Sequence, residues 1–147
     1  MAGEPFLPAD VEIQLAENFP NIKADPELFT QIFQNLIDNA VKFNTSLCKQ
    51  VEIGWQQARN GHLELFVRDN GIGIDPRYQE QIFHPFERLH TREQYPGHGI
   101  GLTLAVKAAN KLHERIRVES APEKGSTFVI ALPICQKEKH EWSKKPL

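Results

Sequence analysis

The fold of this chain is decided by residues 25–43, which read DPELFTQIFQNLIDNAVKF. Asp25, Pro26 and Glu27 are a strong helix start, with a capping carboxylate, a proline at the first helical position and an acid in the first turn. We therefore expect a helix from Pro26 to about Phe43. Its apolar residues recur at helical spacing and form the stripe that faces the core: Phe29, Ile32, Phe33, Leu36, Ile37 and Ala40.

A second stripe on this helix is polar. Four residues at i, i+3, i+4 and i+7 share one face: Asn35, Asp38, Asn39 and Lys42. A polar stripe is usually a solvated face, but such faces are normally built from Glu, Lys, Arg and Gln, since Asn and Asp are costly inside a helix. The composition therefore favours a binding face. An Asn oxygen suits Mg²⁺ that keeps water and phosphate oxygens in its shell, and Lys42 could reach those phosphates.

Short alternating or apolar runs elsewhere predict strands at 11–15, 51–57, 63–68, 116–119 and 127–132. A second helix is expected to begin within 97–101 and to run to about His113. These elements include too few helices to cover both faces of a doubly wound sheet. The sequence therefore predicts an α+β fold, a two-layer α/β sandwich in which about three helices cover one face of a mixed, mostly antiparallel sheet of about five strands. We expect this domain at 10–133, between an N-terminal extension at 1–9 and a charged tail at 134–147.

A glycine-rich turn, Asp69-Asn70-Gly71-Ile72-Gly73, follows the strand at 63–68. Its glycines allow another backbone or a ligand to come close. One interpretation is a plain turn capped by the carboxylate. The other makes Asp69 the acceptor for an exocyclic amine in an apolar pocket. Such a pocket would select adenine, because guanine presents a carbonyl at that position and would leave buried acceptors unpaired.

A second glycine-rich stretch, Gly97-His98-Gly99-Ile100-Gly101-Leu102, opens the expected second helix. Backbone N–H groups at a helix start bind anions readily, although the same glycines would also suit a hinge. Leu102 stands where a dinucleotide fingerprint needs glycine, and the chain has no Gly-Lys-Ser/Thr of a P-loop. The long segment between the two stretches lacks periodicity, which is typical of a lid. Its aromatic anchors would be Phe83 and Phe86, and its phosphate contacts Arg88, Arg92 and His98.

Composition excludes several other classes of protein. The 17 basic and 19 acidic residues leave a formal charge of −2, so the chain has no overall positive field for nucleic acid or an anionic membrane. Cys48 and Cys135 argue against a disulfide framework and a cysteine-built zinc site, and the histidines lack zinc-site spacing. No apolar run is long enough to span a membrane. We therefore expect a cytoplasmic domain.

Five motifs in this order resemble the ATP-binding catalytic domain of sensor histidine kinases, within the superfamily of gyrase, Hsp90-type chaperones and MutL. Residues 35–43 resemble the N box, 69–73 the first glycine box, 83–88 the F box, 97–102 the second glycine box and 125–127 the last short one. The residues at 88–90 and 95–97 are most similar to those of kinases attached to phytochrome-like and related bacterial sensors.

The resemblance implies that Asn39 holds Mg²⁺ with help from Asn35, that Lys42 contacts phosphate and that Asp69 binds the adenine amine. It also implies that 97–102 wraps the triphosphate and that 76–98 forms the ATP lid. The full ATP-binding set implied in this way is Asn35, Asn39, Lys42, Phe43, Asp69, Gly71, Gly73, Ile74, Arg88, Tyr95, Gly97, His98, Gly99, Ile100, Gly101, Leu102 and Thr127.

The implied reaction is transfer of the ATP γ-phosphoryl group to a histidine. In the superfamily's ATPases a glutamate at the position of Asn35 activates water, and an amide cannot take that proton at neutral pH. The family carries its acceptor histidine on a separate dimerisation hairpin before this domain, but no histidine precedes His62. We therefore expect this chain to be either a piece of a larger kinase or a lone domain that acts in trans. The isolated domain is expected to be a monomer and the full-length kinase a homodimer. A response regulator would be an indirect partner. The alternatives are a hydrolysing ATPase and a non-catalytic nucleotide-binding module.

One departure from the family pattern affects the end of the second helix. The family places Gly-Gly after the histidine there, whereas His113 is followed by Glu114 and Arg115. Glycine normally supplies the left-handed residue that ends a helix. We therefore expect this helix to end in a different way.

Overall fold

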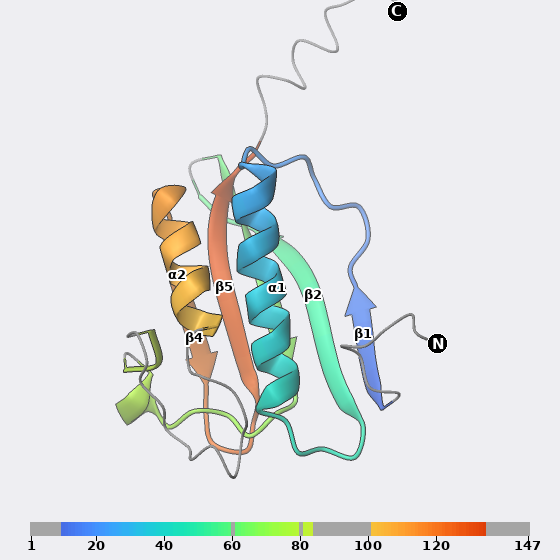
Figure 1. The fold of residues 1–147 in the computed structure, drawn as a ribbon. Helices are drawn as coiled ribbons and strands as arrows, with labels where there is room; N and C mark the ends of the chain where they lie inside the picture. The colour runs from blue at the N-terminus through green and yellow to red at the C-terminus, as the bar shows by residue number, and fades with distance from the viewer. Residues whose placement is uncertain (1–9, 60, 80, 84–100, 135–147) are drawn as a thin grey trace, which may run out of the picture.

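One five-stranded sheet forms the back of the molecule, in the order β1-β2-β3-β5-β4 (Figure 1). This computed structural model describes residues 10–59, 61–79, 81–83 and 101–134. The strands are β1 (Val11–Leu15), β2 (Lys49–Gln57), β3 (His62–Asp69), β4 (Ile116–Ser120) and β5 (Ser126–Pro133). β1 pairs with β2 in parallel, and the other pairs are antiparallel. The predicted mixed sheet is confirmed, and several strands extend one or two residues beyond the predicted limits.

Two α-helices cover one face of this sheet, α1 (Pro26–Lys42) and α2 (Gly101–Lys111) (Figure 1). Where about three helices were expected, the described residues form these two and two single-turn 3₁₀ helices, η1 (Pro76–Tyr78) and η2 (Gln81–Phe83). α1 begins as predicted, because Asp25 Oδ1 accepts hydrogen bonds from the N–H groups of Glu27 and Leu28 at 2.8 and 3.2 Å. None of the helices in the described ranges is long and apolar enough to cross a membrane.

The core lies between the helices and the sheet. α1 contributes Ile32 and Leu36, both 0% exposed, and α2 contributes Ala105 and Ala109. The inward residues of the central strands alternate as a half-buried sheet requires: Leu63, Leu65 and Val67 on β3, and Phe128, Ile130 and Leu132 on β5. Each large side chain of this kind stabilises the fold by about 1.5–3 kcal/mol through burial. This packing fixes α1 against β3 and so sets the position of its polar stripe.

The end of β5 is joined to the segment that leads into α1. Ile22 forms a bridge with Ile134, and the Lys23 N–H donates to the Pro133 carbonyl at 2.9 Å. The Ile134 N–H donates in turn to the Gly61 carbonyl at 2.9 Å. Ile134, predicted to open the tail, is therefore part of the packed domain. Residues 1–9 and 135–147 lie outside the described ranges.

α2 ends in a hydrogen-bonded cap that contains no glycine, although the family usually has a glycine pair at this position. The Glu114 N–H donates to the Ala109 carbonyl and the His113 N–H to the Asn110 carbonyl, both at 2.9 Å. These are the two bonds of a Schellman motif, and His113 is its left-handed residue, with φ of 62°. A histidine therefore occupies the backbone conformation that glycine usually supplies.

We predict that His113→Gly stabilises the protein by about 1 kcal/mol, because glycine adopts positive φ without the strain of a β-carbon. The exposed side chain of His113 has little packing to lose. Denaturant unfolding would measure the gain, with His113→Ala as the control, which keeps the β-carbon and should gain nothing. Equal stability of the glycine and alanine variants would contradict the assignment.

Candidate functional site

Several predicted motifs meet at one end of the sheet. There the last turn of α1 lies near the end of β3, the start of β5 and the start of α2 (Figure 1). The Ile72 N–H donates to the Phe43 carbonyl at 3.1 Å, which joins the glycine-rich turn to the end of α1. Asp69 and Ser126 face each other in the register of β3 and β5. The fold therefore brings the first glycine box beside the N box.

The polar stripe of α1 is open to a ligand. Asn35 Nδ2 donates to the Gln31 carbonyl at 2.8 Å, which leaves its Oδ1 available. Asn39 is half-buried and Lys42 is exposed. In the described part of the chain, no side chain bonds the Asn39 carboxamide or pairs with the Lys42 ammonium group. Asn39 and Lys42, two of the three predicted phosphate-side residues of α1, are thus uncommitted.

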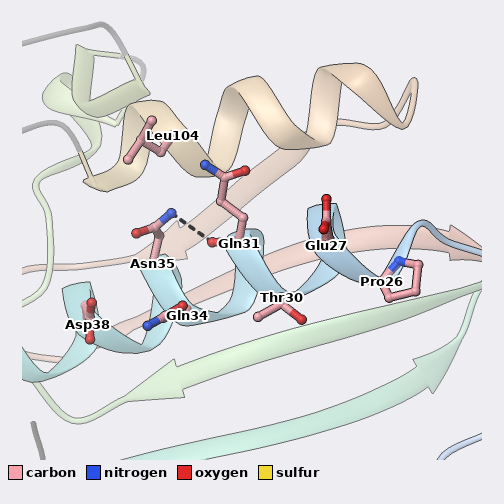
Figure 2. A pocket seen from close by; sticks show the side chains of 8 residues that line it. All are labelled: Pro26, Glu27, Thr30, Gln31, Gln34, Asn35, Asp38 and Leu104. Carbon is pink, nitrogen blue, oxygen red and sulfur yellow. Dashed lines mark hydrogen bonds between the residues drawn. The ribbon is translucent and has the colours of Figure 1, made fainter.

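A shallow groove of about 660 Å³ continues this stripe toward the start of α1 (Figure 2). Asn35 and Asp38 lie at one end, and Leu104 of α2, 37% exposed, forms an apolar rim on the other side. The complete lining is Pro26, Glu27, Thr30, Gln31, Gln34, Asn35, Asp38 and Leu104. Asn39 and Lys42 lie beyond it, nearer the glycine-rich turn.

Asp69 presents one free carboxylate oxygen. Its Oδ1 accepts hydrogen bonds from the N–H groups of Gly71 at 2.8 Å and Ser126 at 3.2 Å. No partner for Oδ2 occurs among the residues that the structure describes. Burial raises the pKa of Asp69 to about 6, and the two N–H groups partly oppose that rise. The carboxylate is therefore oriented at one oxygen and available at the other.

Glycine is required in this turn for steric reasons. A β-carbon at Gly71 would collide with the Phe43 carbonyl oxygen and would come too close to Asp69 Oδ1. Gly73 has φ of +76°, and a β-carbon there would collide with the carbonyl of Ala121. The predicted close approach is thus made by the protein's own backbone. Gly71 leaves the end of α1 in direct contact with the turn that carries Asp69.

The segment after the turn is fastened to the sheet. The Ile74 N–H donates to Ser120 Oγ at 2.8 Å, and Gln79 Nε2 donates to the carbonyls of Ile74 and Ser120 at 3.1 and 2.9 Å. Phe83 packs edge-on against Phe128 with ring centroids 6.4 Å apart. The first residues of the predicted lid, 76–79 and 81–83, are therefore anchored. The other predicted residues of the lid and of the second glycine box that precede Gly101 lie outside the described ranges, namely Phe86, Arg88, Arg92, Tyr95, Gly97, His98, Gly99 and Ile100.

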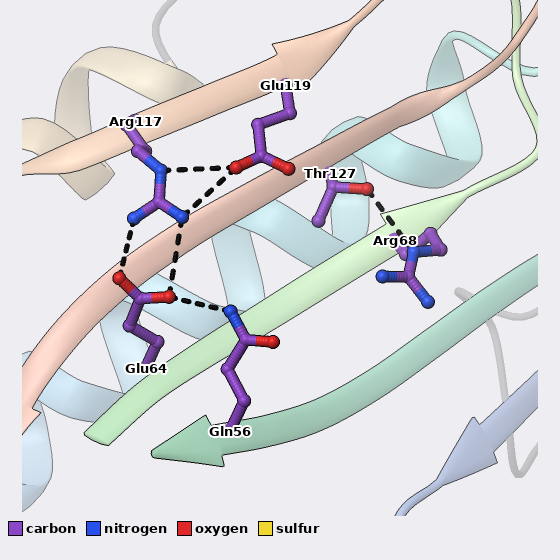
Figure 3. Close-up of polar contacts among 6 residues, drawn as sticks. All are labelled: Gln56, Glu64, Arg68, Arg117, Glu119 and Thr127. Carbon is purple, nitrogen blue, oxygen red and sulfur yellow. Dashed lines mark hydrogen bonds and ion pairs between the residues drawn. The ribbon is translucent and has the colours of Figure 1, made fainter. Parts of the chain in front are cut away.

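Two predicted residues take other positions. Thr127 points to the face of the sheet away from the helices, where its hydroxyl accepts a hydrogen bond from Arg68 Nε at 3.3 Å (Figure 3). The side chain on the Asp69 side is that of Ser126, which the sequence reasoning missed although Phe128, two residues on, is plainly a core residue. Leu102 is 7% exposed and belongs to the core, so only its backbone is left for a ligand. Gly101 is the first residue of α2.

The face on which Thr127 lies is filled by charged side chains that pair with one another (Figure 3). Arg117 bonds Glu64 at 2.8 Å and Glu119 at 3.0 Å, and Arg68 bonds Glu52 at 3.0 Å. The Arg117 guanidinium lowers the pKa of Glu64. These pairs are solvated and each contributes little to stability. This face lies on the other side of the sheet from α1 and α2 (Figure 3).

The polar groups at the end of α1 and at the end of β3 fit a magnesium-bound adenine nucleotide. A half-buried carboxylate with a free oxygen matches an exocyclic amine, and a carboxamide with a lysine matches a hydrated cation on phosphate. The Asp69 carboxylate and the Asn39 carboxamide belong to segments joined by the Ile72–Phe43 hydrogen bond. The groups that the fold brings together are therefore those that the sequence motifs predicted for the two ends of a nucleotide.

Comparisons with known proteins agree with this geometry. Residues 24–136 match the family described as histidine kinase-, DNA gyrase B-, and HSP90-like ATPase. The chain is 42% identical over 120 residues to cyanobacterial phytochrome A of a Nostoc species, covering 82% of this chain and 16% of that protein. It resembles the mycobacterial sensor histidine kinase MprB with a TM-score of 0.74 and 27% identity, covering 86% of this chain and 83% of the other.

A second solved structure, full-length ShkA in complex with AMPPNP, matches with a TM-score of 0.71 and 27% identity, covering 84% of this chain and 26% of ShkA. The chain thus spans only about a sixth of the phytochrome relative. The predicted resemblance to the catalytic domains of sensor histidine kinases, and to a phytochrome-linked one in particular, is confirmed. The chain belongs to the family of histidine kinase-, DNA gyrase B- and HSP90-like ATPases.

Proposed function

We propose that this chain binds Mg²⁺-ATP and donates the γ-phosphoryl group to a histidine on a separate helical hairpin of a sensor kinase. The observation that carries the proposal is the free Oδ2 of Asp69, which the glycine-rich turn joins to the end of α1 that carries the uncommitted Asn39 carboxamide. Similarity to ShkA, solved with AMPPNP, supports nucleotide binding. Similarity to a phytochrome and to MprB supports the kinase assignment.

The base end of the nucleotide is assigned to Asp69. Its Oδ1 is held by two backbone N–H groups, so Oδ2 is the atom that accepts the adenine amine. A ligand with a carbonyl in place of that amine would leave two acceptors facing each other in a half-buried site, which costs about 1–3 kcal/mol. Selection of adenine over guanine follows.

The phosphate end is assigned to α1. Asn39 would hold Mg²⁺ together with phosphate oxygens, Asn35 would assist through its free Oδ1, and Lys42 would contact phosphate. When bound, Mg²⁺ neutralises charge on the phosphates. The protein's own contribution is to orient the nucleotide through both ends, which is most of what phosphoryl transfer requires.

Transfer is favoured over hydrolysis by the side chain at position 35. Asn35 Nδ2 already donates to the Gln31 carbonyl, and a carboxamide takes no proton at neutral pH. The groove beside Asn35, with Leu104 as an apolar rim, gives an acceptor helix a path to the phosphate end. We expect the parent kinase to be cytoplasmic or anchored at the cytoplasmic side of a membrane. We expect it to be a homodimer whose phosphoryl group passes on to a response regulator.

Asn39→Ala is expected to abolish the Mg²⁺-dependent part of ATP binding. The gain in affinity on adding Mg²⁺ should fall by about tenfold or more, because a coordinating oxygen is lost without a substitute. Calorimetry with ATP, in Mg²⁺ and then in EDTA, measures this difference. The control is Asn110→Ala, the same change at an exposed position of α2. A full Mg²⁺ effect in the Asn39 variant would contradict the metal assignment.

The function itself is tested by mixing the purified chain with Mg²⁺-ATP and a separately supplied histidine-bearing hairpin from a sensor kinase. Appearance of acid-labile phosphate on the hairpin is the expected result. Release of inorganic phosphate without a hairpin, well above background, would instead favour a hydrolysing ATPase. Tight ATP binding with neither reaction would favour a non-catalytic nucleotide-binding module.

A further inference from the structure

The carboxamide of Asn70 joins three segments of the chain. Its Oδ1 accepts hydrogen bonds from Asn44 Nδ2 at 2.7 Å and from the Gln50 N–H at 2.9 Å, and its Nδ2 donates to the Cys48 carbonyl at 3.1 Å. Both lone pairs of the oxygen are therefore used. The backbone of Asn70 is held as well, since its carbonyl accepts from Ser46 Oγ at 3.0 Å and its N–H donates to the Gln50 carbonyl at 3.3 Å.

The principal partner, Asn44, is buried and equally committed. It is 3% exposed, and its Oδ1 accepts a hydrogen bond from the Ser46 N–H at 2.9 Å. Breaking the Asn44–Asn70 bond would therefore leave a buried amide unpaired. These hydrogen bonds hold the turn at Asn70 to residues 44–50.

The position of this network relates it to both ends of the candidate nucleotide site. Asn44 comes two residues after Lys42 and directly after Phe43, whose carbonyl receives the Ile72 N–H at 3.1 Å. Asn70 comes directly after Asp69 and directly before Gly71, whose N–H orients Asp69 Oδ1. The Asn44–Asn70 bond thus spans from the phosphate side to the base side.

We infer that Asn70, held by Asn44, is a positioning residue that fixes the base-binding Asp69 relative to the phosphate-binding end of α1. This inference rests on the function proposed above. A ligand that must contact both ends at once binds more tightly when their separation is fixed in advance, because the cost of ordering the protein is then already met. Asn70 itself needs no contact with the ligand.

The inference predicts an unequal effect on two ligands. In Asn70→Ala the affinity for Mg²⁺-ATP should fall by about tenfold or more, because this ligand uses both ends of the site. The affinity for adenosine should change by less than about threefold, because it contacts the base end alone and Asp69 stays oriented by Gly71 and Ser126. A purely structural role would not change the ratio of the two dissociation constants.

The experiment measures both dissociation constants by titration for the unaltered chain, Asn70→Ala, Asn44→Ala and the double variant, each at a temperature where circular dichroism shows it folded. The double variant should bind Mg²⁺-ATP no more weakly than Asn70→Ala, because the two single changes break the same Asn44–Asn70 hydrogen bond. Asn44→Ser serves if an alanine variant does not fold. Arg117→Gln is the control: it removes a comparable set of bonds from the opposite face and should leave both constants unchanged.

The outcomes separate this inference from the proposed function. Unchanged Mg²⁺-ATP affinity in the folded Asn70 and Asn44 variants would overturn the inference, as would equal losses for ATP and adenosine. If the unaltered chain binds no Mg²⁺-ATP, the proposed function fails first and the inference fails with it.

Discussion

Replacing Asp69 with asparagine is expected to lower the affinity for Mg²⁺-ATP by at least about 100-fold while the protein stays folded. Asp69 Oδ1 accepts hydrogen bonds from the N–H groups of Gly71 and Ser126. The new side chain must keep its carbonyl oxygen there, because its NH₂ group would otherwise face two donors. That NH₂ group therefore replaces Oδ2 and meets the adenine amine donor to donor.

The same geometry gives the variant a new preference. Inosine triphosphate carries a carbonyl where ATP carries the amine, and that carbonyl can accept from the introduced NH₂ group. Calorimetry with both nucleotides should therefore show ATP favoured by the unaltered chain and the preference lost or reversed in the variant. Glu119→Gln, the same change on the opposite face of the sheet, is the matched control. Unchanged ATP affinity in Asp69→Asn would contradict the assignment of the base site.

The variant should also lose a pH dependence whose sign is fixed by the pKa of about 6. Only the ionised carboxylate accepts the adenine amine at Oδ2, so ATP affinity should fall as the pH drops from 7 to 5, by about tenfold per unit below the pKa. Stability moves the other way. Because the folded pKa of Asp69 lies above the unfolded value near 3.8, the contribution of Asp69 to the unfolding free energy is largest below about pH 4 and declines by roughly 3 kcal/mol as the pH rises past 6.

Asp69→Asn has no such group to ionise, so both profiles should become flat near pH 6. The variant should then be the more stable protein at pH 8 and the weaker nucleotide binder. Urea unfolding and ATP titration across pH 5–8 measure the two trends. A stability profile identical to that of the unaltered chain would show that burial of this carboxylate costs nothing.

Features that depend on neighbours along the chain were predictable from the sequence. The Asp25 cap and the apolar stripe of residues 29–40 place α1 correctly, because they act within a few turns of one helix. Alternation places β1 and the inward residues of β3 and β5 for the same reason. Asp69 stood out because it ends such a strand beside two glycines.

Features that depend on which segments meet were not predictable. Ser126 and Thr127 both follow Gly125, and only the register with Asp69 shows which of the two faces the site. Asn44 and Asn70 are 26 positions apart, and no local pattern indicates that their carboxamides lie 2.7 Å from each other. The left-handed His113 depends on where α2 ends, which sequence patterns locate only within a few residues.

Gly73→Ala is expected to destabilise the protein by more than about 3 kcal/mol, a large share of the 5–15 kcal/mol typical of a domain. Its φ of +76° alone would strain an alanine, and the new β-carbon would also collide with the Ala121 carbonyl. That carbonyl cannot easily move, since Lys124 N–H donates to it at 3.1 Å and Glu123 N–H donates to the Ile72 carbonyl at 2.6 Å. Both bonds would have to give way.

Gly61→Ala separates the collision from the strain of positive φ. Gly61 has a nearly equal φ of +72°, yet a β-carbon there meets no atom within 4 Å. Its alanine variant should lose only about 1 kcal/mol, the cost of the left-handed conformation. Urea unfolding of the two variants gives the difference directly. Similar losses of unfolding free energy in the two variants would mean that the 121–124 turn moves to accommodate the new methyl group. The close packing of that turn against residues 72–73 would then not be the reason for glycine at position 73.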